Sequence, residues 1–497
     1  MLRRLNFHYL LAITLCVLFA LLNFVDGRGG ASELQPLVLR FIDSHYLEND
    51  FFVNSSEIYN VRHYIVRYLS LFVNFFGIER GMHIAGLLSF ISTLFFVYLI
   101  SFKLTANVLT SFIVLFFAII PRNAGIDLGE WFLVSNQIGA NQLVMPLILG
   151  GLYFVLSQKN LIALILFSIL SFLHPLLGLE MISLFVLYIF FFENKIMSKV
   201  IVLMTFSIII GNYIFDLTQV SDLFYFDAVT LKEILIEYRH PHHYLIFNNG
   251  FLGPFIFLIL LLISWLMLQS NSKVSVDFIN MFFFIMLPLS LFSIISINFY
   301  PLHIAISSIP FRLLSVIGYL VIIISFGMIV SQVMSLNFKY EIFLGLKTRY
   351  YLMVFIIFFS LCMVAINSIQ HKRLLVLNNV IDGIIPIDQD YIDLVNFSSK
   401  INELTEPDAT IITSISEIKF LSNRATFEGS QFPFIDVYME EWYKRRKDLS
   451  QADTDDSLQY LKIHYSLDGP IYAVIGSKRK TKFSSLYCNQ TLCLIKI

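Results

Sequence analysis

The chain has 497 residues, of which 57% are hydrophobic and only 14% charged, and its net charge is −1. A soluble protein carries about a quarter charged residues, so this composition excludes an ordinary soluble protein. No basic patch is dense enough to indicate a nucleic-acid partner. The sequence also contains no Walker A loop, dinucleotide-binding glycine motif or nucleophile elbow. No motif therefore indicates a reaction driven by a nucleotide.

Apolar runs recur along the chain, each long enough to cross about 30 Å of hydrocarbon as a helix. We place about eleven of them, near residues 8–25, 82–102, 104–120, 139–156, 161–176, 179–192, 199–216, 251–269, 278–298, 311–334 and 350–367. The fifth and sixth form one apolar stretch that His174, Pro175 and Glu180 interrupt. The sequence therefore predicts an α-helical polytopic membrane domain over residues 1–369.

Basic residues in the short loops predict the orientation of these helices. Arg3 and Arg4 precede the first run, which we interpret as a retained anchor because no small-residue cleavage site follows it. With the N-terminus inside, the short loops that carry lysine lie inside as well. The longer loops 26–81, 121–138, 217–250 and 299–310 then lie outside, together with the tail from about residue 370.

The first outer loop, residues 26–81, is long for a connector and holds the acidic residues Asp43, Glu48 and Asp50. Glu48 and Asp50 could hold a divalent cation such as Mg or Mn, or one carboxylate could act as a base. Acidic pairs are also common in solvated loops, so that interpretation stays open. Apolar residues at helical spacing over 57–76 predict an amphipathic helix on the membrane surface.

Other ionisable side chains fall at the outer membrane boundary. Arg122 follows the end of an apolar run, where it either extends toward lipid phosphates or holds a ligand phosphate. Arg312 lies inside the top of a run beside Pro310 and should face a cavity or an ion-pair partner. His174 and Glu180 either belong to a functional site, as ionisable residues at membrane depth, or are a helix cap and the start of the next helix.

The outer loop over 217–250 contains a cluster of histidines, His240, His242 and His243, directly after Arg239. Imidazoles can bind a metal, contact a phosphate or sugar, or act as acid and base. Pro241 should hold His240 and His242 in an extended geometry, and adjacent histidines point in different directions. This disfavours one metal ion and favours phosphate or sugar contact, with a plain surface turn as the alternative.

Residues 370–497 are rich in charged and polar residues and predict a small α/β domain outside the membrane. The expected elements are a helix near 390–403, strands near 409–413 and within 417–427, a helix over 434–449, and strands near 471–475 and 491–496. Cys488 and Cys493 either form a disulfide that closes a hairpin or stay free thiols.

This layout resembles the GT-C class of membrane glycosyltransferases. The run Tyr46-Leu-Glu48-Asn-Asp50 is similar in character to the acidic first outer loop of that class. Residues 405–413, followed by 420–424, look like the start of the C-terminal domain in bacterial members. The resemblance implies transfer of a sugar from a polyprenyl-phosphate donor to a glycan or protein acceptor. It also implies a location in a bacterial plasma (inner) membrane and a role in cell-envelope polysaccharide biosynthesis. At the site it implies an Asp or Glu of the first outer loop that acts as the base, and basic residues that bind phosphate.

Other functions fit the composition as well. A transporter or flippase should carry charged residues in mid-span and internal repeats, and neither is evident. A polysaccharide polymerase or ligase would also work on the outer face with arginine and histidine. A further alternative is a non-catalytic assembly or sensor protein with an outer domain.

Overall fold

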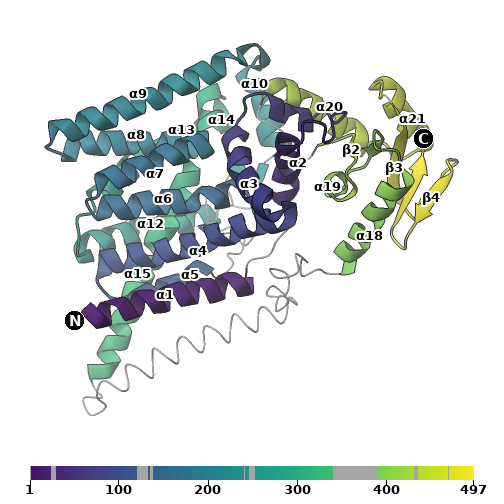
Figure 1. Cartoon of the computed structure of the whole chain (residues 1–497). Coiled ribbons are helices and arrows are strands. Elements are labelled where there is room, and N and C mark those ends of the chain that lie inside the picture. Colours follow the sequence, from purple (N-terminus) through teal and green to yellow (C-terminus); the bar gives the residue numbers. More distant parts are fainter. Residues whose placement is uncertain are drawn as a thin grey trace.

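The computed structural model describes residues 2–23, 30–119, 133–134, 138–239, 241–245, 252–339, 389–429, 435–467 and 469–497 (Figure 1). Ten helices coincide with ten of the predicted spans: α1 (Leu2–Asn23), α4 (Ile78–Thr105), α5 (Val108–Ile119), α6 (Ala140–Leu156), α7 (Asn160–Leu173), α8 (Pro175–Phe192), α9 (Ile196–Thr218), α12 (Leu252–Asn271), α13 (Asp277–Phe299) and α15 (Phe311–Lys339). The predicted span near 350–367 lies outside the described residues.

Six segments of the described chain are long and apolar enough to cross a membrane by length and composition. Further apolar helices of 10–17 residues accompany them. The fold is therefore that of a multi-pass helical membrane protein, while the number of eleven spans and the orientation stay predictions. On α9 only 17% of the most apolar window is buried, as expected of a helix that faces lipid.

Small residues bring the membrane helices close together. Gly178 on α8 lies so near α7 that a Cβ atom at this position would be 2.1 Å from the Cα atom of Ser171. Ser89 on α4 donates a hydrogen bond of 2.6 Å to the carbonyl oxygen of Gln142 on α6. Close backbone approach and inter-helix hydrogen bonds of this kind hold helices together where lipid offers no hydrophobic driving force.

The predicted first outer loop is structured. Helix α2 (Gly30–Ile42), the short 3₁₀ helix η1 (Val53–Glu57) and helix α3 (His63–Phe76) form it. The predicted amphipathic helix is confirmed as α3, but it begins later than expected because Asn60 makes a turn, its side-chain oxygen accepting from the amide of Arg62 at 2.8 Å. Figure 1 shows α2 and α3 between the membrane helices and the C-terminal domain.

The C-terminal domain comprises α18 (Gln389–Leu404), β1 (Thr410–Ile412), α19 (Ile418–Ser422), β2 (Ala425–Thr426), α20 (Asp436–Ser450), α21 (Asp455–His464), β3 (Ile471–Gly476), β4 (Ser485–Cys488) and β5 (Leu492–Lys496). The sheet order is β2-β1-β3-β5-β4. Strand β1 runs parallel to β2 and β3, whereas β5 is antiparallel to β3 and β4. Helices α18 and α19 pack on one face and α21 on the other. The predicted elements are present, and α21 and β4 were not predicted.

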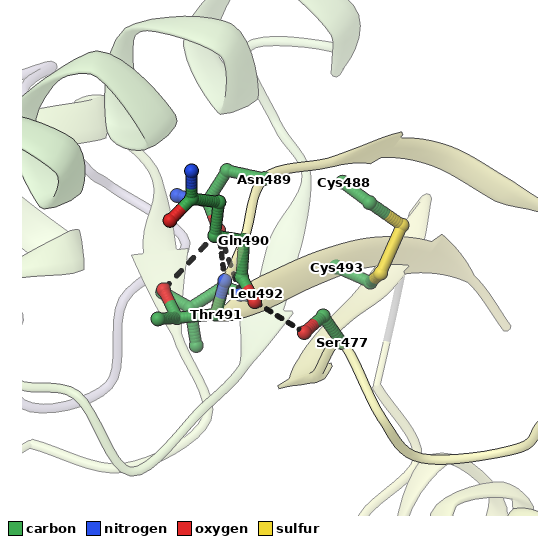
Figure 2. Close-up of a disulfide and its surroundings, with 7 residues drawn as sticks. All are labelled: Ser477, Cys488, Asn489, Gln490, Thr491, Leu492 and Cys493. Atoms are coloured by element: carbon green, nitrogen blue, oxygen red, sulfur yellow. Dashed lines mark hydrogen bonds between the residues drawn. A yellow bond between two sulfur atoms is a disulfide. The ribbon is translucent and has the colours of Figure 1, made fainter.

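The hairpin of β4 and β5 is closed by a disulfide between Cys488 and Cys493, which face each other across the two strands (Figure 2). The side chain of Asn489 accepts hydrogen bonds from the amides of Thr491 and Leu492 at 2.9 and 2.7 Å. Ser477 donates to the carbonyl oxygen of Gln490 at 2.7 Å. Of the two interpretations of these cysteines, the structure therefore has the disulfide.

Candidate functional site

Three arginines from distant parts of the sequence converge where the loops meet the membrane helices. Arg62 caps the start of α3 and donates from Nε and Nη2 to one oxygen of Glu33 on α2, at 2.7 and 2.5 Å. Glu33 is only 8% exposed. A buried carboxylate of this kind is stable only when it is paired, so this ion pair joins α2 to α3.

Arg239 ends the π-helix η3 (Lys232–Arg239), which follows α10 (Ala228–Leu231). It lies within electrostatic reach of Glu33 and Arg62, and burial lowers the pKa of Arg239 to about 10. Its guanidinium group also lies over the ring of Trp442 on α20, 5.6 Å from the ring centroid. The side chain is therefore charged at neutral pH and only half-buried.

Arg312 lies in the first turn of α15, after the short helix α14 (His303–Ser308). The turn between them places Ile309 at φ +42°, a left-handed conformation that is strained for a β-branched residue. Backbone strain of this sort persists where the surrounding structure enforces it, often at functional sites. Arg312 lies within electrostatic reach of Tyr244, Glu180 and Arg62, so Arg312 belongs to the same group of side chains.

Tyr244 closes α11 (Pro241–Tyr244) and is 2% exposed. Burial raises the pKa of Tyr244 to about 12, against the opposing effect of Arg312 and Arg239. It therefore offers a neutral hydroxyl group beside these two guanidinium groups.

His174 lies between α7 and α8 and caps α8, because its Nδ1 accepts from the amide of Leu177 at 3.4 Å. Nε2 then carries the proton and donates to Oδ1 of Asn141 at 2.8 Å. The predicted cap is confirmed. The charges of Arg62 and Arg312 also act on this ring, so His174 is a neutral neighbour of the arginines.

Glu180 lies on α8, and the charges of Glu180 and Arg312 act on each other. Both carboxylate oxygens are inaccessible to solvent, and neither has a hydrogen-bond partner among the described residues. A buried carboxylate without such a partner is a strong functional candidate.

We name this group the arginine cluster; its members are Glu33, Arg62, His174, Glu180, Arg239, Tyr244 and Arg312. Three half-buried arginines lie within electrostatic reach of two carboxylates, so the cluster holds more arginines than carboxylates. Arginine forks bind phosphate with two parallel hydrogen bonds, so the cluster is suited to a phosphate group. Sequence reasoning singled out Arg239, Arg312 and His174 for the site but did not assign Glu33, Arg62, Glu180 or Tyr244 to it.

The acidic run of the first loop lies elsewhere, against the C-terminal domain. Asp50 is 1% exposed, and its oxygens accept from the amides of Phe52 and Val53, from Nζ of Lys419 at 2.8 and 2.9 Å and from the amide of Thr426 at 3.0 Å. Its contacts are those of a carboxylate that joins two segments.

Asp43 and Glu48 are exposed, and their carboxylates contact the nearby His45: Asp43 accepts from its amide at 2.9 Å and Glu48 lies 3.3 Å from its ring nitrogen Nδ1. Glu48 and Asp50 do not form an evident divalent-cation site, because the oxygens of Asp50 face amides and a lysine. Across the described ranges, no three His, Cys, Asp or Glu side chains are grouped as metal ligands.

The C-terminal domain also contacts the loop before η3. Asp436 accepts from the amides of Tyr225 and Phe226 at 2.6 and 2.5 Å. Tyr443 donates to Glu233 at 2.9 Å. A cleft of about 420 Å³ opens between this loop and the helices α20 and α21. The domain therefore joins the first loop to η3, the helix that ends in Arg239.

The remaining predicted residues are only partly placed. Arg122 and His240 lie outside the described residues, as do the side chains of His242 and His243. The backbone at these last two residues belongs to the helix α11, in which Pro241 is the first residue. The expected extended geometry after Pro241 is therefore wrong, because proline at the first helical position has a φ angle suited to a helix.

Comparison with known proteins finds a structural similarity only. No protein-family model matches the chain, and no curated protein matches it. The structure is similar to ArnT from Cupriavidus metallidurans bound to undecaprenyl phosphate, with a TM-score of 0.51 at 8% identity, over 98% of this chain and 97% of that one. The apo state of the same protein gives 0.49 at 10% identity, over 98% and 96%. ArnT is a GT-C glycosyltransferase, so the fold expected from the resemblance is confirmed.

Proposed function

We propose that this chain is a GT-C-type glycosyltransferase that uses a sugar donor linked to a polyprenyl phosphate. The observation that carries the proposal is the arginine cluster, a half-buried, positively charged group at the junction of loops and membrane helices. The similar ArnT structure is bound to undecaprenyl phosphate, which supports a lipid phosphate as the ligand.

The reaction breaks the bond between the sugar and the phosphate oxygen, so negative charge grows on the departing phosphate. Arg239 and Arg312 would stabilise that charge, and the Tyr244 hydroxyl would donate a hydrogen bond to it. Because these groups are held by the fold before the donor arrives, little reorganisation is needed during transfer.

A base must take the proton of the acceptor hydroxyl that attacks the sugar. Within the cluster Glu33 is engaged by Arg62, whereas Glu180 has no hydrogen-bond partner in the described chain. We therefore propose Glu180 as the base. The sequence predicted Asp50 or Asp43 as the base. The oxygens of Asp50 accept from Lys419 and backbone amides, so Asp43, just after α2, is the alternative; a rise over ten helical residues would separate it from Glu33 by about 15 Å.

We further propose that the cluster faces the outside of a bacterial plasma (inner) membrane, where the acceptor is a glycan or a protein of the cell envelope. The Cys488–Cys493 disulfide supports an outer position of the C-terminal domain, because disulfides persist in oxidising compartments. The proposed mechanism assigns no metal ion to Glu48 and Asp50, because the oxygens of Asp50 accept from Lys419 and backbone amides.

The test is binding of undecaprenyl phosphate to the full chain in lipid nanodiscs. Arg312→Gln and Arg239→Gln should each weaken binding about 10-fold or more, because each removes a charged hydrogen-bond donor. Arg67→Gln is the matched control: Arg67 lies on α3 in the same loop but is exposed. If the wild-type chain does not bind the lipid, or if all three variants bind alike, the proposed function is wrong.

A further inference from the structure

The C-terminal domain reaches the arginine cluster through one aromatic side chain. Trp442 on α20 presents its ring to the guanidinium group of Arg239 at 5.6 Å from the ring centroid. Attraction between a cation and an indole face is strongest where water is excluded. Trp442 is 6% exposed, so this contact is desolvated.

The ring of Trp442 is itself held in place. Its Nε1 donates to Oε1 of Glu428 at 3.2 Å, and the other oxygen of Glu428 accepts from Arg446 at 2.7 Å. Glu428 is 7% exposed, so its carboxylate is oriented by these two partners. These contacts within the C-terminal domain hold the indole plane.

The helix η3 is held from the same side. The ring of Tyr238 packs edge-on against Trp442 and Tyr443, with centroids 5.7 and 4.9 Å apart. Tyr443 also donates to Glu233, one turn or more before Arg239 on η3. Two consecutive residues of α20 therefore determine where η3 ends, and with it the position of Arg239.

We propose that Trp442 is a positioning residue for Arg239, so that the C-terminal domain completes the phosphate-binding site of the membrane domain. This inference rests on the proposed function, in which Arg239 binds the donor phosphate. Arg239 also lies within electrostatic reach of Glu33 and Arg62, which belong to the first loop. Arg239 is thus held between a loop of the membrane domain and a helix of the tail, and binding depends on both.

The first experiment tests the contact without any ligand. The chain has three tryptophans. The double substitution Trp131→Phe and Trp265→Phe therefore leaves Trp442 as the single indole emitter. Arg239→Gln in that background should change the intensity and the wavelength of the Trp442 emission, because the cation over the ring is removed. An unchanged spectrum would overturn the contact.

The second experiment measures undecaprenyl phosphate binding to the full chain in nanodiscs. Trp442→Ala should weaken binding about 3- to 30-fold, and Trp442→Phe should restore part of the loss because a ring remains. Trp265→Phe is the matched control, since Trp265 is also buried but lies on α12 with its Nε1 bound to Asn280. It should bind the lipid like the wild type.

Non-additivity separates positioning from a general loss of structure. In an Arg239→Gln background, Trp442→Ala should cause no further loss of binding, because its effect passes through Arg239. Additive losses, or wild-type affinity in Trp442→Ala, would overturn the inference while leaving the proposed function intact. A wild-type chain that does not bind the lipid would contradict both the proposed function and this inference.

Discussion

At the residue scale, the same side-chain type has different uses in different surroundings. Asp50 and Asp43 are seven residues apart in one loop, yet Asp50 is enclosed by a lysine and backbone amides while Asp43 is open to solvent. Burial with a full set of donors makes a carboxylate structural, and it costs such a carboxylate its freedom to move a proton. Mutation of Asp50 should therefore affect stability much more than mutation of Asp43.

Asp50→Asn should destabilise the docking of the C-terminal domain by about 3 kcal/mol, because Lys419 is left as a buried charge without its partner. The measurement is the midpoint of thermal unfolding together with the rate of proteolysis between the domains. Asp43→Asn, at an exposed site, should change stability by less than about 0.5 kcal/mol. Equal effects of the two substitutions would contradict this assignment.

Glu180→Gln should lower the rate of sugar transfer by about 10²- to 10⁴-fold while undecaprenyl phosphate still binds, because a neutral amide cannot accept the proton. The measurement is a transfer assay alongside binding in nanodiscs. Asp43→Asn serves as the comparison. Loss of transfer in Asp43→Asn with activity retained in Glu180→Gln would return the base to the acidic loop.

The pKa of Arg239, lowered to about 10 by burial, predicts how binding depends on pH. Below that pKa the guanidinium is protonated, so affinity for undecaprenyl phosphate should be the same at about pH 7 and about pH 9. As the pH rises through about 10, the charge is lost and binding should weaken. Titrations at a series of pH values test this. Arg239→Gln should not show that fall.

At the element scale, short contacts between helices determine where the site residues lie. Helices α7 and α8 approach closely at Gly178, between His174 and Glu180. The turn that His174 caps depends on this approach, and so does the direction in which α8 carries Glu180 into the arginine cluster. Gly211 on α9 has open space where a Cβ atom would lie, with nothing within 4 Å.

Gly178→Ala should therefore destabilise the protein by about 1–3 kcal/mol, because the new methyl group would overlap the backbone of α7. Gly211→Ala should be neutral or slightly stabilising, since alanine favours a helix and meets no neighbour there. Thermal unfolding in detergent compares the two variants. Equal stability of both would show that α7 and α8 do not pack in this way.

At the scale of the whole molecule, the C-terminal domain is part of the site and not an appendage. Lys419 and Thr426 of this domain donate hydrogen bonds to Asp50. Trp442 and Tyr443 contact η3. These contacts lie on one side of the membrane helices, where the arginine cluster also lies. The proposed function therefore predicts a side-specific reaction, in which donor phosphate, base and tail domain share one face.

This arrangement and the disulfide predict that the C-terminus is outside the membrane. A fusion of alkaline phosphatase after Ile497 should be active in bacterial cells, while a fusion of green fluorescent protein at the same position should be dark. The reverse pattern would place the arginine cluster on the inner face and contradict the predicted orientation.

The sequence by itself determined the membrane class, ten of the helices and most of the C-terminal elements. Those features depend on local patterns, namely long apolar runs and the alternation of apolar residues, which neighbouring positions carry. It also indicated Arg239, Arg312 and His174, because an ionisable side chain near an apolar run is conspicuous. Glu180 was conspicuous for the same reason but was not assigned to the site, whereas Glu33 carried no such local signal.

Only the tertiary structure decided which residues meet. The partner of Asp50 is Lys419, 369 positions away in the sequence, and no local pattern could show that this acidic residue is enclosed. The arginine cluster joins α2, α3, α8, η3, α11 and α15, elements whose mutual positions follow from helix packing alone. Burial and partner charge determine what an ionisable group does, and both are properties of the folded chain.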